Sequence, residues 1–225
     1  MEEKAHIPNN VKILDEMERA VYALLKPYGF RKHGRTLHRF VDGDISQVIT
    51  FQLGQSYLEM NHLLFVNVGI RVPECMTRSF SPEETQKKYY HEYECNIRSR
   101  LGSIEGKEES CYDLRRPGEP ITADILRQIR DIVLPTFEAL NSRDAILDHR
   151  REYPSFDLLN NHLILLEEAM IHGRRGQLDK ATDCMNQYYR LFASGQLAQK
   201  DPKVTQNHLR YVEELAEKLG LTIII

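Results

Sequence analysis

Residues 30–53 read FRKHGRTLHRFVDGDISQVITFQL, and this stretch decides the fold. Two extended runs, Phe30–Val41 and Ile45–Leu53, flank the triplet Asp42-Gly43-Asp44. An Asp-Gly pair between two such runs is typical of a β-hairpin, because glycine readily adopts the positive φ that the turn needs. Four apolar side chains of the second run fall on one face: Ile45, Ile49, Phe51 and Leu53. The stretch therefore predicts an antiparallel hairpin with one buried face.

The flanking segments extend this hairpin into a helix-backed sheet. Leu63–Val72 is rich in Val, Leu, Phe and Ile and ends before Pro73, which predicts a third strand. Before the hairpin, apolar side chains recur every three or four residues in Val11–Lys26, as on one face of a helix. The fold class that follows is α+β: a helix-backed antiparallel β-meander with a C-terminal all-helical segment.

Helices and one short strand are predicted after the meander. Ser81-Pro82-Glu83-Glu84 is typical of a helix start, and the helix is expected to continue through Tyr89, Tyr93, Ile97 and Leu101 to Gly102. Cys111–Leu114 is expected to be a strand. Thr122 is expected to cap a helix that Pro135 kinks or splits, and Ser142 to start a short helix. The apolar stripe of the Pro135 helix is Ile125, Ile129, Val133 and Phe137.

A domain boundary is predicted at Tyr153-Pro154-Ser155, which separates residues 1–153 from residues 154–225. Three helices are expected beyond it: Phe156–His172, Leu178–Ala193 and Pro202–Leu219. Residues 156–193 resemble a single tetratricopeptide-like helical hairpin around Gly176 and Ala181. The apolar end, Leu221–Ile225, is expected to dock as a short edge strand or to pack against a neighbouring chain.

Composition predicts a soluble protein of the cytoplasm. Hydrophobic residues make up 41% and charged residues 28%, as in ordinary folded domains. The longest apolar runs, Leu63–Val66 and Leu163–Leu166, are far below the roughly 20 residues of a membrane-spanning helix. No signal peptide is visible, and four cysteines without CxxC spacing favour reduced thiols. A net charge of −3 disfavours a dedicated nucleic-acid binder.

Three sequence blocks carry a family resemblance. They are LKPYGFRKHGRT at residues 25–36, VITFQL at 48–53 and FVNVGI at 65–70. On these blocks, residues 14–150 resemble the bacterial family catalogued as domain of unknown function 4304. The family usually has a Trp-containing segment near the position of Tyr112-Asp113-Leu114, and this chain contains no Trp. The resemblance implies an α+β fold and a bacterial, intracellular setting, and it brings no activity with it.

The basic run is the first candidate site: Arg31, Lys32, Arg35 and Arg39, with no acidic residue among them. On one continuous strand Arg31, His33, Arg35 and Arg39 would share a face, with Lys32 and His38 on the other. Such a row could bind phosphate or carboxylate groups through bidentate hydrogen bonds. The alternative is an edge strand that its cations protect from aggregation.

Two amides within apolar strands, Gln52 and Asn67, are further ligand-binding candidates, although such groups also pair with neighbouring polar atoms. His91, Glu94 and Cys95 would share a helix face at metal-ligand spacing, but a metal needs ligands from elsewhere as well, and we predict no metal site. The sequence has no phosphate-binding loop, nucleophile elbow or HExxH motif. We therefore predict no cofactor and no catalytic residue.

Three hypotheses for function follow. The first is a non-catalytic protein-binding or regulatory module, whose sheet face or edge contacts a protein partner. The second is a weak binder of nucleic acid or of a phosphorylated ligand through residues 31–39. The third is a hydrolase whose catalytic residues come together only in the fold, as catalytic triads do.

Overall fold

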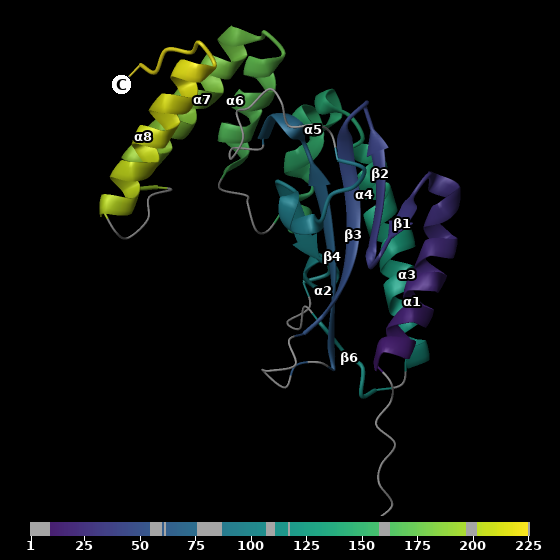
Figure 1. The fold of residues 1–225 in the computed structure, drawn as a ribbon. Helices are drawn as coiled ribbons and strands as arrows, with labels where there is room; N and C mark the ends of the chain where they lie inside the picture. The colour runs from purple at the N-terminus through teal and green to yellow at the C-terminus, as the bar shows by residue number, and fades with distance from the viewer. Residues whose placement is uncertain are drawn as a thin grey trace, which may run out of the picture. The chain divides into compact units, whose positions relative to one another are not determined.

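The computed structural model describes residues 10–54, 60, 62–75, 87–106, 111–116, 118–157, 163–196 and 202–224. The chain divides into two compact units (Figure 1). The first comprises Met1–Val72 with Glu83–Leu159, and the second comprises Pro73–Pro82 with Asn160–Ile225. Within the described ranges, no helix combines the length and apolar character that crossing a bilayer requires.

The first unit is built on a six-stranded antiparallel sheet, which confirms the predicted α+β class. Its strand order is β1-β2-β3-β4-β5, and β6 also pairs with β4. The predicted strands at 45–53 and 63–72 and the short strand near 111–114 are all present. The strands are β1 (Arg31–His33), β2 (Thr36–Val41), β3 (Ile45–Leu53), β4 (Leu63–Arg71), β5 (Ile97–Arg100) and β6 (Tyr112–Asp113).

The prediction of one strand over Phe30–Val41 was wrong. Gly34 has a φ of +55°, and with Arg35 it makes a two-residue turn, so that β1 folds back on β2. The register pairs Arg31 with His38 and His33 with Thr36. Because cross-strand partners point to the same face, the arginines of this segment do not form the single row that a continuous strand would give.

Helices cover one face of the sheet (Figure 1). The long helix α1 (Asn10–Leu25) confirms the predicted first helix and buries Leu14, Met17 and Val21. The second covering helix runs from α3 (Gly118–Gln128) to α4 (Leu134–Ala139). Burying one such aliphatic side chain contributes about 1.5–3 kcal/mol, so these stripes hold the layers together. The predicted stripe Ile125, Ile129, Val133 and Phe137 is completely buried.

Pro135 disturbs its helix as predicted. A π-helical turn, Ile129–Val133, separates α3 from α4 directly before this proline. Proline offers no N–H and its ring clashes with the carbonyl one turn earlier, and a wider turn relieves that clash. The predicted cap at Thr122 was wrong, because α3 starts at Gly118 and the Thr122 hydroxyl donates to the Gly118 carbonyl at 2.9 Å. Ser142 caps α5 (Arg143–His149) as predicted, accepting from the Ala145 N–H.

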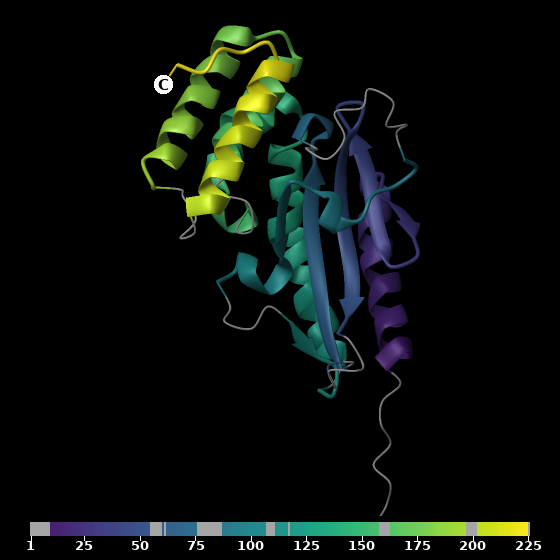
Figure 2. The ribbon, with the colours of Figure 1, turned by 60° about the vertical axis from the view of Figure 1, so that its left-hand side comes forward.

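The helix predicted from Ser81 to Gly102 is absent from residues 87–100, and residues 81–86 lie outside the described ranges. Residues 87–96, here called the strap, are neither α-helix nor strand and contain a 3-10 turn at Glu92–Glu94. The strap crosses the sheet face opposite the helices (Figure 2) and leads into β5. The short helix α2 (Leu101–Ile104) follows. The apolar spacing of four that suggested a helix instead reflects aromatic contacts of the strap and alternate burial along β5.

The second unit contains α6 (Ile164–Arg174), α7 (Leu178–Ala193) and α8 (Pro202–Lys218). The predicted second and third C-terminal helices are confirmed. The predicted start at Phe156 was wrong, because Pro154–Asp157 is a 3-10 turn and residues 158–162 lie outside the described ranges. Residues 221–224 form no strand; instead, the Ile224 N–H donates to Asn186 Oδ1 of α7 at 2.8 Å.

A polar pair on the helix-covered face joins the two covering helices to the sheet. Arg39 and Gln47 are cross-strand partners, and Arg39 Nε donates to Gln47 Oε1 at 2.7 Å. Arg39 Nη1 donates to the Tyr28 carbonyl at 3.0 Å, and Nη2 lies 2.6 Å from Glu138 Oε1. Gln47 Nε2 donates to the Phe137 carbonyl at 2.6 Å. Carbonyls at helix ends lack intrahelical partners, so this pair caps two helical ends at once.

Gln47→Leu should lower the free energy of unfolding by about 1–3 kcal/mol for each buried group that it leaves unpaired. Gln47 is completely buried, and the substitution removes the acceptor of Arg39 and the donor to Phe137. Urea unfolding monitored by circular dichroism measures the effect. The matched control is Gln187→Leu on the exposed side of α7, which should change stability by less than about 0.5 kcal/mol. Equal stabilities of the two variants would contradict the capping role.

Candidate functional site

The sheet face opposite the helices carries a continuous polar row. Cross-strand register aligns one residue from each of β1 to β5 on this face. We call these five residues the polar row: His33, Thr36, Thr50, Asn67 and Arg100. Its two ends are exposed, whereas Thr36 and Asn67 are buried. A row of donors and acceptors across a sheet can bind a polar ligand or support residues that do.

Hydrogen bonds connect the members of the row to each other and to their surroundings. The Thr36 hydroxyl lies 3.3 Å from the Thr50 hydroxyl and 3.3 Å from Nδ1 of His91 in the strap. Asn67 Nδ2 donates to Gln52 Oε1 at 3.1 Å. The two amides that the sequence singled out therefore lie together on this face, bonded to each other. The interior of the row holds its own polar groups in place.

Aromatic rings of the strap pack on the β1 end of the row. We call this group the histidine–tyrosine cluster: His33, His38, Tyr89, His91 and Tyr93. The rings of His33 and Tyr89 stack with centroids 3.7 Å apart, and those of His91 and Tyr93 stack at 5.2 Å. Tyr89 also contacts His91 edge to face, so the rings run continuously from the edge strand to the exposed Tyr93. These ring contacts hold the strap against the sheet.

His38 is the buried member of this cluster. Its pKa is lowered from the ordinary 6.5, first because burial penalises the imidazolium and then because electrostatic interactions with Arg31 and His33 disfavour a positive charge on it. The side chain is 6% exposed, and within the described residues its Nδ1 has no hydrogen-bond partner. His38 is therefore neutral in the fold at pH values where an exposed histidine begins to take up a proton.

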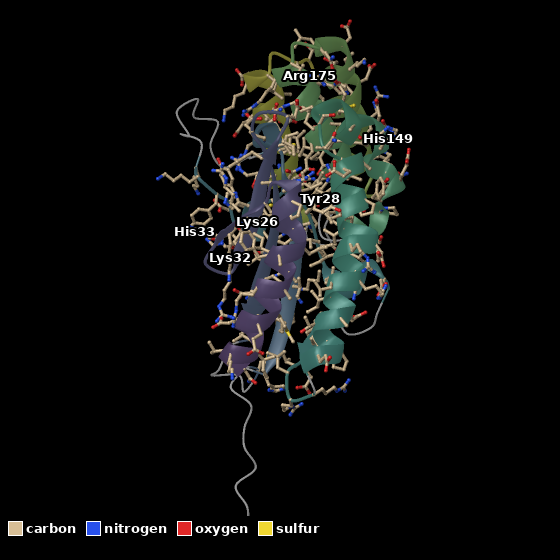
Figure 3. All side chains as sticks on the ribbon, turned by 90° about the vertical axis from the view of Figure 1, so that its right-hand side faces the viewer. Lys26, Tyr28, Lys32, His33, His149 and Arg175 are labelled. Atoms are coloured by element: carbon tan, nitrogen blue, oxygen red, sulfur yellow. The ribbon has the colours of Figure 1, made fainter. Side chains whose placement is uncertain are left out.

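The edge strand β1 provides the second part of the site. Its three residues, Arg31, Lys32 and His33, are all exposed, and we call them the basic edge. Figure 3 shows Lys32 and His33 there, with Lys26 and Tyr28 close by in the connection from α1. Arg31 and His33 point to the polar-row face, whereas Lys32 points to the helix-covered face.

The four predicted cationic candidates have different surroundings. Lys32 Nζ lies 2.7 Å from the buried Glu18 carboxylate of α1, and Arg35 Nη1 lies 3.7 Å from the same carboxylate. The guanidinium of Arg39 belongs to the capping pair, and its side chain is 10% exposed. Of the four, Arg31 is the one that is exposed on the polar-row face.

The metal-ligand spacing at His91, Glu94 and Cys95 falls on the 3-10 turn of the strap rather than on a helix. Burial acts to raise the pKa of Glu94, but hydrogen bonds from the His91 N–H and from Lys87 outweigh it and lower that pKa. Burial, followed by the charge of Glu92, raises the pKa of the Cys95 thiol far above its usual range. Among the described residues, no group of three or more His, Cys, Asp or Glu side chains could hold a metal ion.

Comparison with known proteins adds one match. The family model for the domain of unknown function (DUF4304) covers residues 21–139. The chain belongs to the DUF4304 family. Within the DUF4304 region lie the last five residues of α1, the whole sheet, the strap and the helices through α4. No curated protein and no solved structure matches the chain.

Sequence reasoning found part of this DUF4304 site. It identified Arg31, Lys32, Gln52 and Asn67, and it missed Thr36, Thr50 and the strap. Thr50 could have been found, since it lies an even number of residues from Gln52 in the same strand. Arg100 could not have been found, because its segment was taken for a helix.

The lowered pKa of His38 predicts a pH dependence of stability. The unfolded state binds a proton near pH 6.5 and the folded state binds it only at lower pH, so stability should fall as the pH drops below 6.5. His38→Gln should flatten the change in unfolding midpoint between pH 7.5 and pH 5.5. The control is His149→Gln. Because Glu152 raises the pKa of His149, this variant should show a steeper loss of stability on acidification rather than a flatter one. Identical pH profiles of wild type and His38→Gln would rule out this origin.

The Lys32–Glu18 pair predicts a second stability effect. Lys32→Met removes the nearest cation from a carboxylate that is 2% exposed. Losing one partner of a fully buried pair costs about 3–5 kcal/mol. Lys32 itself is 29% exposed, so about 1–3 kcal/mol is expected here. Lys32→Arg should retain most of the stability. Chemical unfolding of both variants measures the two losses of stability. Equal losses for Lys32→Met and Lys32→Arg would contradict a role for the positive charge at position 32.

Proposed function

We propose that this DUF4304 protein is a non-catalytic protein-binding module of the bacterial cytoplasm. It would contact its partner through the basic edge and the adjoining histidine–tyrosine cluster. The observation that supports this most directly is the exposure of all three β1 residues at an edge of the sheet. A binding function needs an accessible surface of defined shape, and these two groups of residues provide one.

The two edges of the sheet differ. At the β5 edge, the Ser99 hydroxyl donates to the Ser155 carbonyl at 3.1 Å, so the 3-10 turn at Pro154–Asp157 packs there. Beyond β1 no described residue pairs as a further strand. Proteins commonly cover or blunt edge strands, and a covered edge opposite an open one is consistent with a contact surface at the open edge.

Two exposed tyrosines belong to segments that adjoin the basic edge. Tyr28, three residues before β1, is 45% exposed, and Tyr93 of the strap is 66% exposed. Tyrosine is enriched in protein–protein interfaces, because its ring supplies contact area and its hydroxyl supplies a hydrogen bond. An edge strand that is only protected from aggregation would need charged side chains and no exposed tyrosines. The tyrosines therefore favour a binding surface over an edge that is merely protected.

The other two hypotheses have less support. A phosphate-binding row needs several free cations on one face, whereas Lys32 and Arg35 share Glu18 and Arg39 is a structural cap. For a hydrolase, the described part of this site offers the Thr36 hydroxyl within 3.3 Å of a histidine nitrogen, and Thr36 is 2% exposed. A substrate could not reach that oxygen in this conformation.

Site-specific photocrosslinking in the native host tests the proposal. A benzoyl-phenylalanine at position 93 replaces an exposed ring with a similar one, and the same residue at Glu16 on the exposed side of α1 is the control. We expect a discrete covalent adduct with one protein from position 93 and none from position 16. Adducts that are equally abundant at both positions, or absent from both, would refute the proposed surface.

A further inference from the structure

The backbone of β1 offers hydrogen-bonding groups on its outer side. His33 and Thr36 flank a two-residue turn, so they are a hydrogen-bonded pair. The next pair, Lys32 and Leu37, is then a non-hydrogen-bonded pair, in which the N–H and C=O of Lys32 point away from β2. The bond from the Phe51 N–H to the Arg35 carbonyl, at 3.0 Å, fits this alternation.

We infer that the partner contributes an extended peptide segment that lies along β1, with acidic side chains at alternating positions. This inference rests on the proposed function and names its binding mode. An added strand would bond to the N–H and C=O of Lys32, as in other cases of strand addition to a sheet edge. Its side chains would then alternate between the polar-row face and the helix-covered face.

Charge complementarity determines the chemistry of that segment. On the polar-row face the partner strand would meet Arg31 and His33, two positions apart. The acidic side chain adjoining β1, Glu18, is 2% exposed and is already shared by Lys32 and Arg35, so it offers little repulsion to an incoming carboxylate. Carboxylates spaced by two residues are therefore the matching group.

The site is also ordered before binding. The ion pair with Glu18 holds Lys32, and the stack on Tyr89 holds the ring of His33. Less conformational freedom is therefore lost when a partner binds. Arg31 can bind a carboxylate through two parallel hydrogen bonds, and charge-assisted bonds are stronger than the neutral backbone bonds to Lys32. Charge should thus contribute more to affinity than the added backbone pair.

A nucleic-acid strand matches these features less well. Its phosphates could contact Arg31, but its backbone has no N–H groups to donate to the Lys32 carbonyl. A peptide strand satisfies both the guanidinium and the outward backbone groups. We therefore assign the surface to an acidic peptide, and an oligonucleotide serves as a competitor in the test.

The experiment selects random seven-residue peptides displayed on phage against the full-length protein. We expect enrichment of sequences with Asp or Glu at alternating positions, and their affinity is then measured by fluorescence anisotropy. Arg31→Glu should weaken binding at least about tenfold, because it replaces attraction with repulsion. Arg116→Glu, a charge reversal at another exposed arginine, should leave affinity unchanged. N-methylation of the central peptide amide should weaken binding severalfold.

Four results would overturn the inference: no enrichment, enriched peptides without acidic residues, affinity insensitive to Arg31→Glu or to N-methylation, and equal competition by a twelve-nucleotide oligothymidine. Unfolding midpoints of both arginine variants, measured beside the wild type, confirm that each is folded. The photocrosslink at position 93 separates the two levels. If position 93 gives a discrete adduct but the peptide selection fails, only the inference of an acidic strand is refuted. If position 93 gives no adduct, the proposed binding surface is refuted as well.

Discussion

The partly buried contact between Arg39 and Gln47 constrains which face of the sheet the helices cover. Both side chains must point to the helix-covered face, where they meet the carbonyls of Tyr28 and Phe137. Side chains alternate along a strand, and a slip of one residue would turn this pair toward the opposite face and leave those carbonyls unpaired. The same alternation then directs Thr36, His38 and Thr50 away from the helices. The polar face is thus a geometric consequence of a contact on the other side of the sheet.

Local signals predicted much of this fold. The periodic stripe of α1, the Asp42-Gly43 turn and the Ser142 cap each depend on a few neighbouring residues, and each is present. The effect of Pro135 was also predictable, since its missing N–H acts within one turn. The start of α3 was missed because Thr122 resembles a cap in sequence while the chain already turns at Gly118.

The errors arose where tertiary contacts override local pattern. Tyr89, Tyr93, Ile97 and Leu101 are spaced like a helix stripe, yet Tyr89 packs on His33 and Ile97 pairs with Ile70 of β4. For the same reason the candidate site was only half predicted. The basic run was recognised, but Gly34 was not recognised as a turn, so its arginines were assigned to one face. The registers of the strand pairs from β2 to β5 bring Thr36 and Arg100 into one row. Those registers cannot be read from one amino-acid sequence.

The burial of Cys95, a residue of the strap itself, makes its thiol a natural chemical probe of the strap. The thiol is buried beside Gly69, where a Cβ would approach the Cys95 Cβ to 2.7 Å, so this crossing is closely packed. A protonated and enclosed thiol is unreactive toward alkylating reagents. Cys111 and Cys184, by contrast, are partly accessible. The rate at which Cys95 is alkylated therefore measures how often the strap lifts from the sheet, on the same free-energy scale as local opening in amide exchange.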